Sequence, residues 1–342
     1  MKRLLPVMAG LVAAGVLFLA MGLWQAHRLL DQPLQVPAGG VTCEVRPGTA
    51  LSTVSSRLAE RGIVQRPWLL NWYGRITGKA GAIHAGEYLV EAGDTPRTLL
   101  DKFVVGSVRL YSFTIVEGWT FREMLQGLGE HPAIERTLAY EDWPALLERL
   151  EAEYPHPEGL FLPETYRFPR GTSDEEVLRQ AYGLLQKALL EEWQARAVNL
   201  PLDSPYEALT LASIVEKETA RADERARIAG VFVRRLRRGM RLQTDPAVIY
   251  GIGESFDGNL TRRDLQRDTD YNTYTRRGLP PTPIALPGRA AIRAALNPEP
   301  GDELYFVATG LGDGSHKFSA TREQHEAAVR EYLARRRESA GN

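Results

Sequence analysis

An uncharged apolar run near the start of the chain limits what it can fold into more than any other feature. From Leu4 to Trp24 there are 21 residues without Asp, Glu, Lys or Arg. As a helix rising about 1.5 Å per residue, this run spans about 30 Å, the thickness of a bilayer core. A cleaved signal peptide is the alternative, but its cleavage site needs small residues. The run closes with Met21-Gly-Leu-Trp-Gln, which is bulky there, so an uncleaved membrane helix over 4–24 is favoured.

The charges that flank this run indicate its orientation. Lys2 and Arg3 precede it, with the amino terminus, whereas His27 and Arg28 follow it. The larger positive charge stays on the cytoplasmic side. We therefore expect residues 1–3 to form a short cytoplasmic end, with Trp24 at the opposite interface. Residues 25–40, which contain Pro and Gly, suit a tether, and the folded part would then lie outside the cytoplasm.

Composition bounds the class of protein. The 342 residues suit about two domains, and 44% hydrophobic residues are enough for real cores. Lys plus Arg number 42 and Asp plus Glu 43, so no overall charge attracts nucleic acid. One cysteine and no His-Glu-x-x-His helix predict neither a disulfide nor a metal site. Short strands mixed with helices predict an α+β fold.

Three similar phrases follow the tether, each a turn with a glycine and, one or two residues later, a threonine before a helical apolar pattern. They begin at Gly48, Gly93 and Gly118. In each, the glycine makes the turn and the threonine can cap the helix. The first two phrases, with strands predicted over 41–45 and 87–90, resemble a LysM-like peptidoglycan-binding module over residues 41–107. Such phrases also occur in unrelated folds, so a plain spacer remains an alternative.

The stretch from Ala208 to Ala220 is the strongest candidate for chemistry. Its bulky residues Leu211, Ile214 and Val215 share one helix face, and continuing that face leads to Glu218. A carboxyl at the end of an apolar face loses water, which raises its pKa toward the range of a general acid. Glu216 lies on another face and is predicted to be a solvated neighbour. A surface glutamate paired with a nearby Lys or Arg is the alternative for Glu218.

Polar and aromatic residues gather in three turn-rich stretches, 242–250, 270–275 and 278–284. Tyrosine rings suit the CH faces of sugars, and amide, hydroxyl and carboxylate groups suit their hydroxyls. The candidates for binding sugar are Gln243, Thr244, Asp245, Tyr271, Asn272, Thr273 and Tyr274. The strand predicted over 304–308 and the glycine-rich 310–315 that follows indicate a hairpin rather than a phosphate loop.

Five separated blocks in order resemble the membrane-bound endolytic murein transglycosylases, the YceG-like family. They are Leu211-Ala-Ser-Ile-Val-Glu-Lys-Glu-Thr-Ala, Gly239-Met-Arg-Leu-Gln-Thr-Asp-Pro, Tyr271-Asn-Thr-Tyr, Gly278-Leu-Pro-Pro-Thr-Pro-Ile and His316-Lys-Phe. The resemblance implies a catalytic domain over 108–338 in which Glu218 is the catalytic acid and base, with no cofactor. One departure is Glu164, where many members carry Asp.

The implied activity is cleavage of glycan strands between N-acetylmuramic acid and N-acetylglucosamine, leaving 1,6-anhydro ends. Peptidoglycan glycan strands and the bacterial inner membrane are the expected partners, together with peptidoglycan synthases as candidates; the catalytic domain would be periplasmic. Two alternatives stay open. One is a non-catalytic, membrane-tethered scaffold that binds peptidoglycan. The other is a hydrolytic muramidase, which needs a second carboxylate; Asp245, Asp270 and Glu164 are candidates, none of them compelling.

Overall fold

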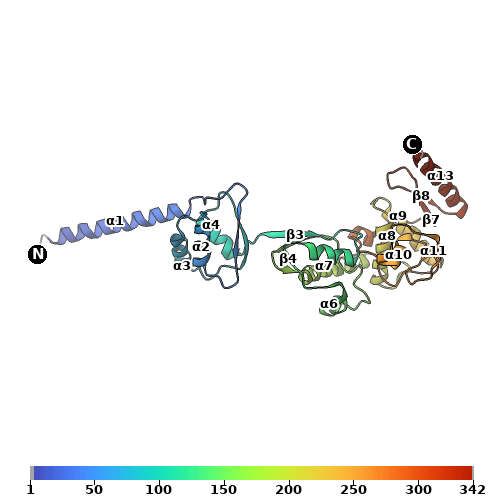
Figure 1. Ribbon diagram of the computed structural model, residues 1–342, viewed down its shortest axis with the longest axis horizontal. Coiled ribbons are helices and arrows are strands. Elements are labelled where there is room, and N and C mark those ends of the chain that lie inside the picture. The colour runs from blue at the N-terminus through green and yellow to red at the C-terminus, as the bar shows by residue number, and fades with distance from the viewer. Residues whose placement is uncertain (1–3, 341–342) are drawn as a thin grey trace. The chain divides into compact units, whose positions relative to one another are not determined.

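The computed structural model describes residues 4–340 and divides into two compact units. One unit comprises Met1–Tyr111 and Arg167–Gly171, and the other comprises Ser112–Tyr166 and Thr172–Asn342. Helices and short two-stranded sheets are mixed throughout, which confirms the α+β class (Figure 1). The predicted domain boundary after residue 107 stays a prediction.

Helix α1 covers the apolar run as Leu4–Leu30. Within the described residues it is the one helix long and apolar enough to cross a membrane, over Gly10–Leu30. Most of that span is exposed, whereas Leu30 at its end is buried. The C-terminal part of α1 meets α3 (Figure 1). The predicted cytoplasmic end, residues 1–3, lies outside the described residues.

The first unit packs three helices against an antiparallel strand pair. Strands β1 (Val41–Val45) and β2 (Gly86–Val90) pair from Val41↔Val90 to Val45↔Gly86. The helices are α2 (Leu51–Glu60), α3 (Pro67–Ile76) and α4 (Pro96–Val105). The core is closed by Tyr88 and Phe103, whose rings meet edge to face at 4.8 Å. The strands predicted from sequence are confirmed, whereas whether this unit is LysM-like stays a prediction.

Threonine caps were predicted for three helices, and two of these predictions are confirmed. Thr95 and Thr120 each form a capping box at the start of α4 and of α5 (Phe121–Glu130). The prediction for Thr49 is wrong. Helix α2 begins one residue later, with Ala50 at its N-cap and no side-chain cap, because the Arg46–Thr49 turn closes before the helix starts.

The second unit is mainly helical. Its further helices and helical turns are η1 (Tyr140–Asp142), α6 (Trp143–Arg149), α7 (Asp174–Gln194), α8 (Pro205–Glu218), α9 (Arg225–Arg237), α10 (Asp245–Ile252), η2 (Gly253–Ser255), α11 (Arg262–Gln266), α12 (Arg289–Leu296) and α13 (Arg322–Ala340). The remaining strands of the chain are short and pair in twos. β3 (Leu110–Thr114) pairs with β5 (Thr165–Pro169), β4 (Ile134–Glu135) with β6 (Thr172–Ser173), and β7 (Tyr305–Ala308) with β8 (His316–Ser319).

Helix α8 is the centre of this unit, since α7, α9, α10 and α12 all pack on it. Its residues from Ala208 to Val215 are completely or almost completely buried. The antiparallel β7–β8 pair joins through residues 309–315, which confirms the predicted hairpin. Helix α13 packs on this hairpin, and the C-terminal end of α8, the hairpin and α13 together border the cavity described next.

Candidate functional site

The candidate site begins at the last residue of α8. The helix starts at Ser204, whose hydroxyl accepts the Glu207 N–H at 3.2 Å, and Pro205 occupies its first turn. It ends at Glu218, after which Thr219 is extended with φ −149° and ψ 134°. Ile214 and Val215 are fully buried one turn earlier. Glu218 therefore lies at the end of α8, where it continues the buried apolar face, as the spacing predicted.

A cavity of about 950 Å³ opens at this helix end. Four of the residues proposed from sequence lie in its wall: Glu218, Gln243, Asp245 and Tyr274. The rest of the lining comes from the end of α9 and the residues after it, from β7 and from α13: Arg235, Met240, Leu242, Tyr305, Phe306, Val307, Arg322, His325, Glu326, Val329 and Arg330. The volume lies in the range of ligand sites. Segments far apart in sequence thus converge on one carboxyl.

Burial controls the proton affinity of Glu218. The pKa of Glu218 is raised from 4.5 to about 7, chiefly by loss of water and in addition by the negative charge of Asp245. The Thr244 hydroxyl and the positive charge of Arg235 act in the opposite direction. Thr244 Oγ1 is buried and has no hydrogen bond of full geometry within the described chain. A carboxyl with a pKa of about 7 is suited both to donating and to accepting a proton near neutrality.

Asp245 and Tyr274 form one unit in the cavity wall. The Tyr274 hydroxyl donates to Asp245 Oδ1 at 2.5 Å, which orients the carboxyl group. Gln243 lines the same wall with φ 51°, in the left-handed region that favours glycine. Its N–H donates to the Thr273 carbonyl at 3.1 Å, which helps to hold this conformation. Such outliers are typical of functional sites.

The other proposed sugar ligands do not line the cavity. Thr244, Asn272 and Thr273 are at most 3% exposed. Asn272 Nδ2 donates to three carbonyls, those of Asp264, Leu265 and Arg267, and Thr273 Oγ1 accepts the Thr244 N–H at 2.9 Å. The Tyr271 hydroxyl lies 2.8 Å from Thr282 Oγ1. These four residues shape the loops that carry Gln243, Asp245 and Tyr274.

Glu216 was predicted to be solvated, and that prediction is wrong. Its side chain is only 5% exposed. Glu216 Oε1 pairs with Arg225 Nη2 at 3.2 Å, and Oε2 accepts the Gly288 N–H at 3.0 Å. A Cβ at Gly288 would meet the end of the Glu117 side chain, which would have to move. Glu216 and Glu218 are thus both withdrawn from water, but of the two only Glu218 lines the cavity.

Comparison with known proteins identifies the family. The profile of the YceG-like family matches residues 43–331. The chain belongs to this family. The chain is 28% identical to the endolytic murein transglycosylase of Bacillus subtilis, over 87% of this chain and 86% of that protein. It is 27% identical to the endolytic murein transglycosylase of Streptococcus pneumoniae, over 94% of this chain but only 65% of that protein's length.

A solved structure is also similar. The crystal structure of a YceG-like protein from Listeria monocytogenes shares 28% sequence identity with this chain and has a TM-score of 0.49. The match covers 84% of this chain and 98% of that one. The residues of this YceG-like protein that the structure describes contain no group of three or more His, Cys, Asp or Glu placed to hold a metal ion.

Sequence reasoning missed several residues of the cavity in this YceG-like protein. Arg235 is only 7% exposed, and its guanidinium donates to the Leu242 and Leu304 carbonyls, each at 2.6 Å. His325 stacks on Tyr305 with ring centres 5.1 Å apart. Burial, together with the positive charge of Arg235, lowers the pKa of His325, which favours the neutral form of its ring. Chain order offered no signal for these contacts, because three distant segments form them.

The alternative carboxyls lie elsewhere. Glu164 borders a separate hollow of about 340 Å³, and Asp270 is exposed and paired with Arg276. Glu158, which sequence reasoning passed over, is buried and accepts hydrogen bonds from the Phe121 N–H and the Tyr250 hydroxyl. Burial raises its pKa to about 8. Of the carboxyls considered as a second catalytic group, only Asp245 shares the cavity with Glu218.

Proposed function

We propose that this protein is an endolytic murein transglycosylase, which cleaves glycan strands internally between N-acetylmuramic acid and N-acetylglucosamine. The observation that carries the proposal is the Glu218 carboxyl, which has a pKa of about 7 and opens into a large cavity with polar and aromatic walls. The relatives named endolytic murein transglycosylase match most of the chain, which supports the same class of reaction.

In the proposed mechanism one carboxyl serves both steps. Protonated Glu218 gives its proton to the glycosidic oxygen, the bond from the muramic C1 to that oxygen breaks, and positive charge develops at C1. The Glu218 carboxylate then takes the proton of the muramic C6 hydroxyl, while the oxygen of that hydroxyl forms the new bond to C1. The products are a free N-acetylglucosamine hydroxyl and a 1,6-anhydro ring, and no water is consumed.

The walls of the cavity suit the substrate. Tyr274 and Tyr305 offer aromatic faces to sugar CH groups, and Gln243 and Asp245 offer hydrogen-bonding groups to hydroxyls. The Asp245 carboxylate also favours positive charge that develops near Glu218. Asp245 is at the same time the second carboxylate that a hydrolytic muramidase would need. The products therefore decide between the two reactions.

Product analysis tests the reaction. Purified glycan strands digested with the full-length protein should release muramic ends that are lighter by one water than hydrolysed ends and that resist borohydride reduction. Mass spectrometry before and after borohydride treatment measures both properties. The matched control is a digest by a known hydrolytic muramidase, whose ends are reduced. Reducible muramic ends from this protein would refute the proposed transglycosylase activity. They would indicate a hydrolytic muramidase that uses Glu218 and Asp245.

The pH dependence of cleavage should follow the pKa of Glu218. Because the first step needs the protonated acid, kcat/KM should fall above about pH 7, by about tenfold per unit. Asp245 raises this pKa and Thr244 lowers it. Asp245→Asn should therefore move the falling limb to lower pH, and Thr244→Val to higher pH. Measured pH profiles of the three proteins check this. If the falling limbs of the three pH profiles coincide, the loss of activity above pH 7 comes from the titration of a group other than Glu218.

Helix α1 supports a location at a membrane. We propose that α1 anchors the protein in the bacterial inner membrane, with its amino end cytoplasmic and the cavity in the periplasm, where peptidoglycan lies. The first unit would bind glycan strands as a LysM-like module. Peptidoglycan synthases remain predicted partners. A non-catalytic scaffold, the alternative from sequence, would need the first unit alone and would not require the buried carboxyl of Glu218.

A further inference from the structure

Helix α3 exposes an apolar face that its own unit does not cover. Leu69, Leu70 and Gly74 are its buried residues. On the opposite side Trp68 is 62% exposed, Trp72 40% and Ile76 61%. Their spacing of four residues places them in one stripe. The outer face of a soluble helix is normally polar, so a contiguous stripe of this size indicates a contact surface.

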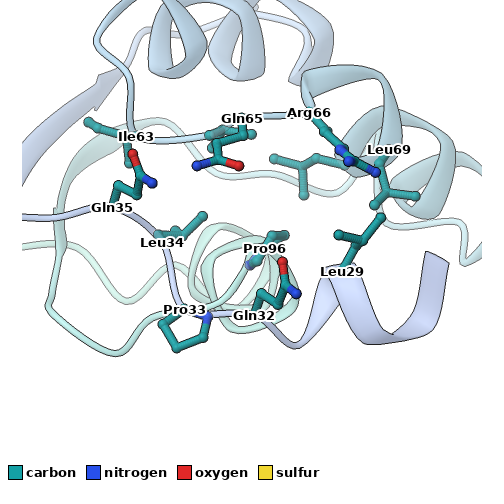
Figure 2. Close-up of a pocket in the computed structure, with 12 residues that line it drawn as sticks. Leu29, Gln32, Pro33, Leu34, Gln35, Ile63, Gln65, Arg66, Leu69 and Pro96 are labelled. Atoms are coloured by element: carbon teal, nitrogen blue, oxygen red, sulfur yellow. The ribbon is translucent and has the colours of Figure 1, made fainter. Parts of the chain in front are cut away.

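The stripe is continuous with the apolar surface of α1. An open groove of about 300 Å³ runs between the two helices, lined by Phe18, Leu19, Gly22, Leu23, Ala26, Trp68, Leu69 and Trp72. A neighbouring cavity of about 280 Å³ lies at the end of α1, where Figure 2 shows Leu29 of α1 and Leu69 of α3 near each other with Arg66 alongside. Any partner that fills the groove must therefore also lie against the C-terminal half of α1.

The charges around α3 suit a phospholipid surface. Residues 61–86 include Arg61, Arg66, Arg75 and Lys79 but no Asp or Glu. Arg66 and Arg75 flank the stripe, are exposed, and form no ion pair with any residue that the structure describes. Tryptophan prefers the membrane interface, and arginine beside it binds lipid phosphates. The composition of α3 is thus that of a helix lying in the plane of an interface.

We propose that α3 is a second membrane contact, inserted in the headgroup region of the leaflet that holds the C-terminal half of α1. This rests on the proposed membrane anchor. Phe18, in the groove, precedes Trp24 by six residues, or about 9 Å along the helix. An interfacial helix buries its apolar face about 5–10 Å deep, so Trp68 and Trp72, which share the groove with Phe18, lie at the depth that such a helix reaches.

A spin label can measure this depth in the full-length protein. Cys43 is the only cysteine and is buried, so a Cys43→Ala background accepts one label at a time. Ile76→Cys reports the stripe and leaves both tryptophans in place. Phe18→Cys reports α1, and Ser56→Cys, on the exposed side of α2, reports the water-facing surface of the same unit. The probe membrane is a nanodisc of phosphatidylcholine and phosphatidylglycerol.

Oxygen concentrates in lipid, whereas a nickel chelate stays in water. The ratio of oxygen collisions to nickel collisions should therefore be several-fold higher for the label at residue 76 than for the label at residue 56. Adding Trp68→Ser and Trp72→Ser should bring residue 76 toward the value of residue 56. A label at residue 76 that behaves like residue 56 in the wild-type background, while residue 18 is in lipid, would refute the proposal and leave the anchor intact. A water-exposed residue 18 would instead refute the anchor. Spin–spin broadening at residue 76 would mean that a second copy covers the stripe.

Discussion

Glu218→Gln should reduce cleavage of glycan strands by about 100- to 10,000-fold, the range that a lost general acid or base accounts for. The amide keeps the shape of the side chain but can neither donate a proton to the glycosidic oxygen nor accept one from the C6 hydroxyl. Folding should be nearly unchanged, because burial disfavours the charged form of this carboxyl and a neutral amide avoids that cost. Release of soluble fragments from purified strands measures the loss.

The matched control is Glu216→Gln, the same chemical change two residues earlier on α8. Glutamine at 216 can still accept the Gly288 N–H, and position 216 does not line the cavity. Cleavage by this variant should stay close to that of the wild type at a temperature where both are folded. Full activity in Glu218→Gln would move the catalyst elsewhere, and binding of strands without any cleavage by the wild type would favour the scaffold.

The position of Glu218 could be predicted because helix periodicity is local. Three buried residues, Leu211, Ile214 and Val215, define the buried face of the helix. Continuing that face along the helix gives the position of the Glu218 carboxyl. The burial of Glu216 could not be predicted in the same way. Its partners, Arg225 and the Gly288 N–H, come from α9 and from the residue just before α12, and helix spacing says nothing about what packs on the other face.

The sugar-binding stretches show the same limit. Composition identified the right segments, but loops have no periodicity to tell which side chains face a cavity. In the first stretch Gln243 and Asp245 line it while Thr244 between them is buried. Arg235 illustrates the converse. Its guanidinium can be buried because the Leu242 and Leu304 carbonyls accept its hydrogen bonds. Both acceptors are backbone groups from other segments, and neither carries a charge.

Local rules also explain what was right in the fold. The caps at Thr95 and Thr120 need only neighbouring residues, and strands β1 and β2 follow from short apolar alternation. Helix α3 was not assigned from sequence. It carries apolar residues on both sides, with Leu69 and Leu70 inside and Trp68 and Trp72 outside, so no single stripe marks it.

Glu216→Ala should destabilise the second unit by about 3 kcal/mol, the lower end of the cost of breaking a buried ion pair. The change removes the acceptor of both Arg225 and the Gly288 N–H. Arg225 is only 14% exposed and its Nε already has no partner among the described residues, so its charge would be left poorly compensated. Glu117, whose Oε2 lies 3.5 Å from Arg225 Nη2, offers partial replacement and keeps the cost at the lower end.

Thermal unfolding followed by circular dichroism measures this cost, with Glu216→Gln and Arg225→Met as comparisons. Glutamine retains a hydrogen-bond acceptor, so Glu216→Gln should unfold at a temperature between those of the wild type and Glu216→Ala. Arg225→Met removes the other partner, and the double variant Glu216→Ala with Arg225→Met should lose less than the sum of the two single losses, because the unpaired charge is then gone. Additive losses would mean that the two side chains do not stabilise each other, and that Glu216 contributes only through Gly288.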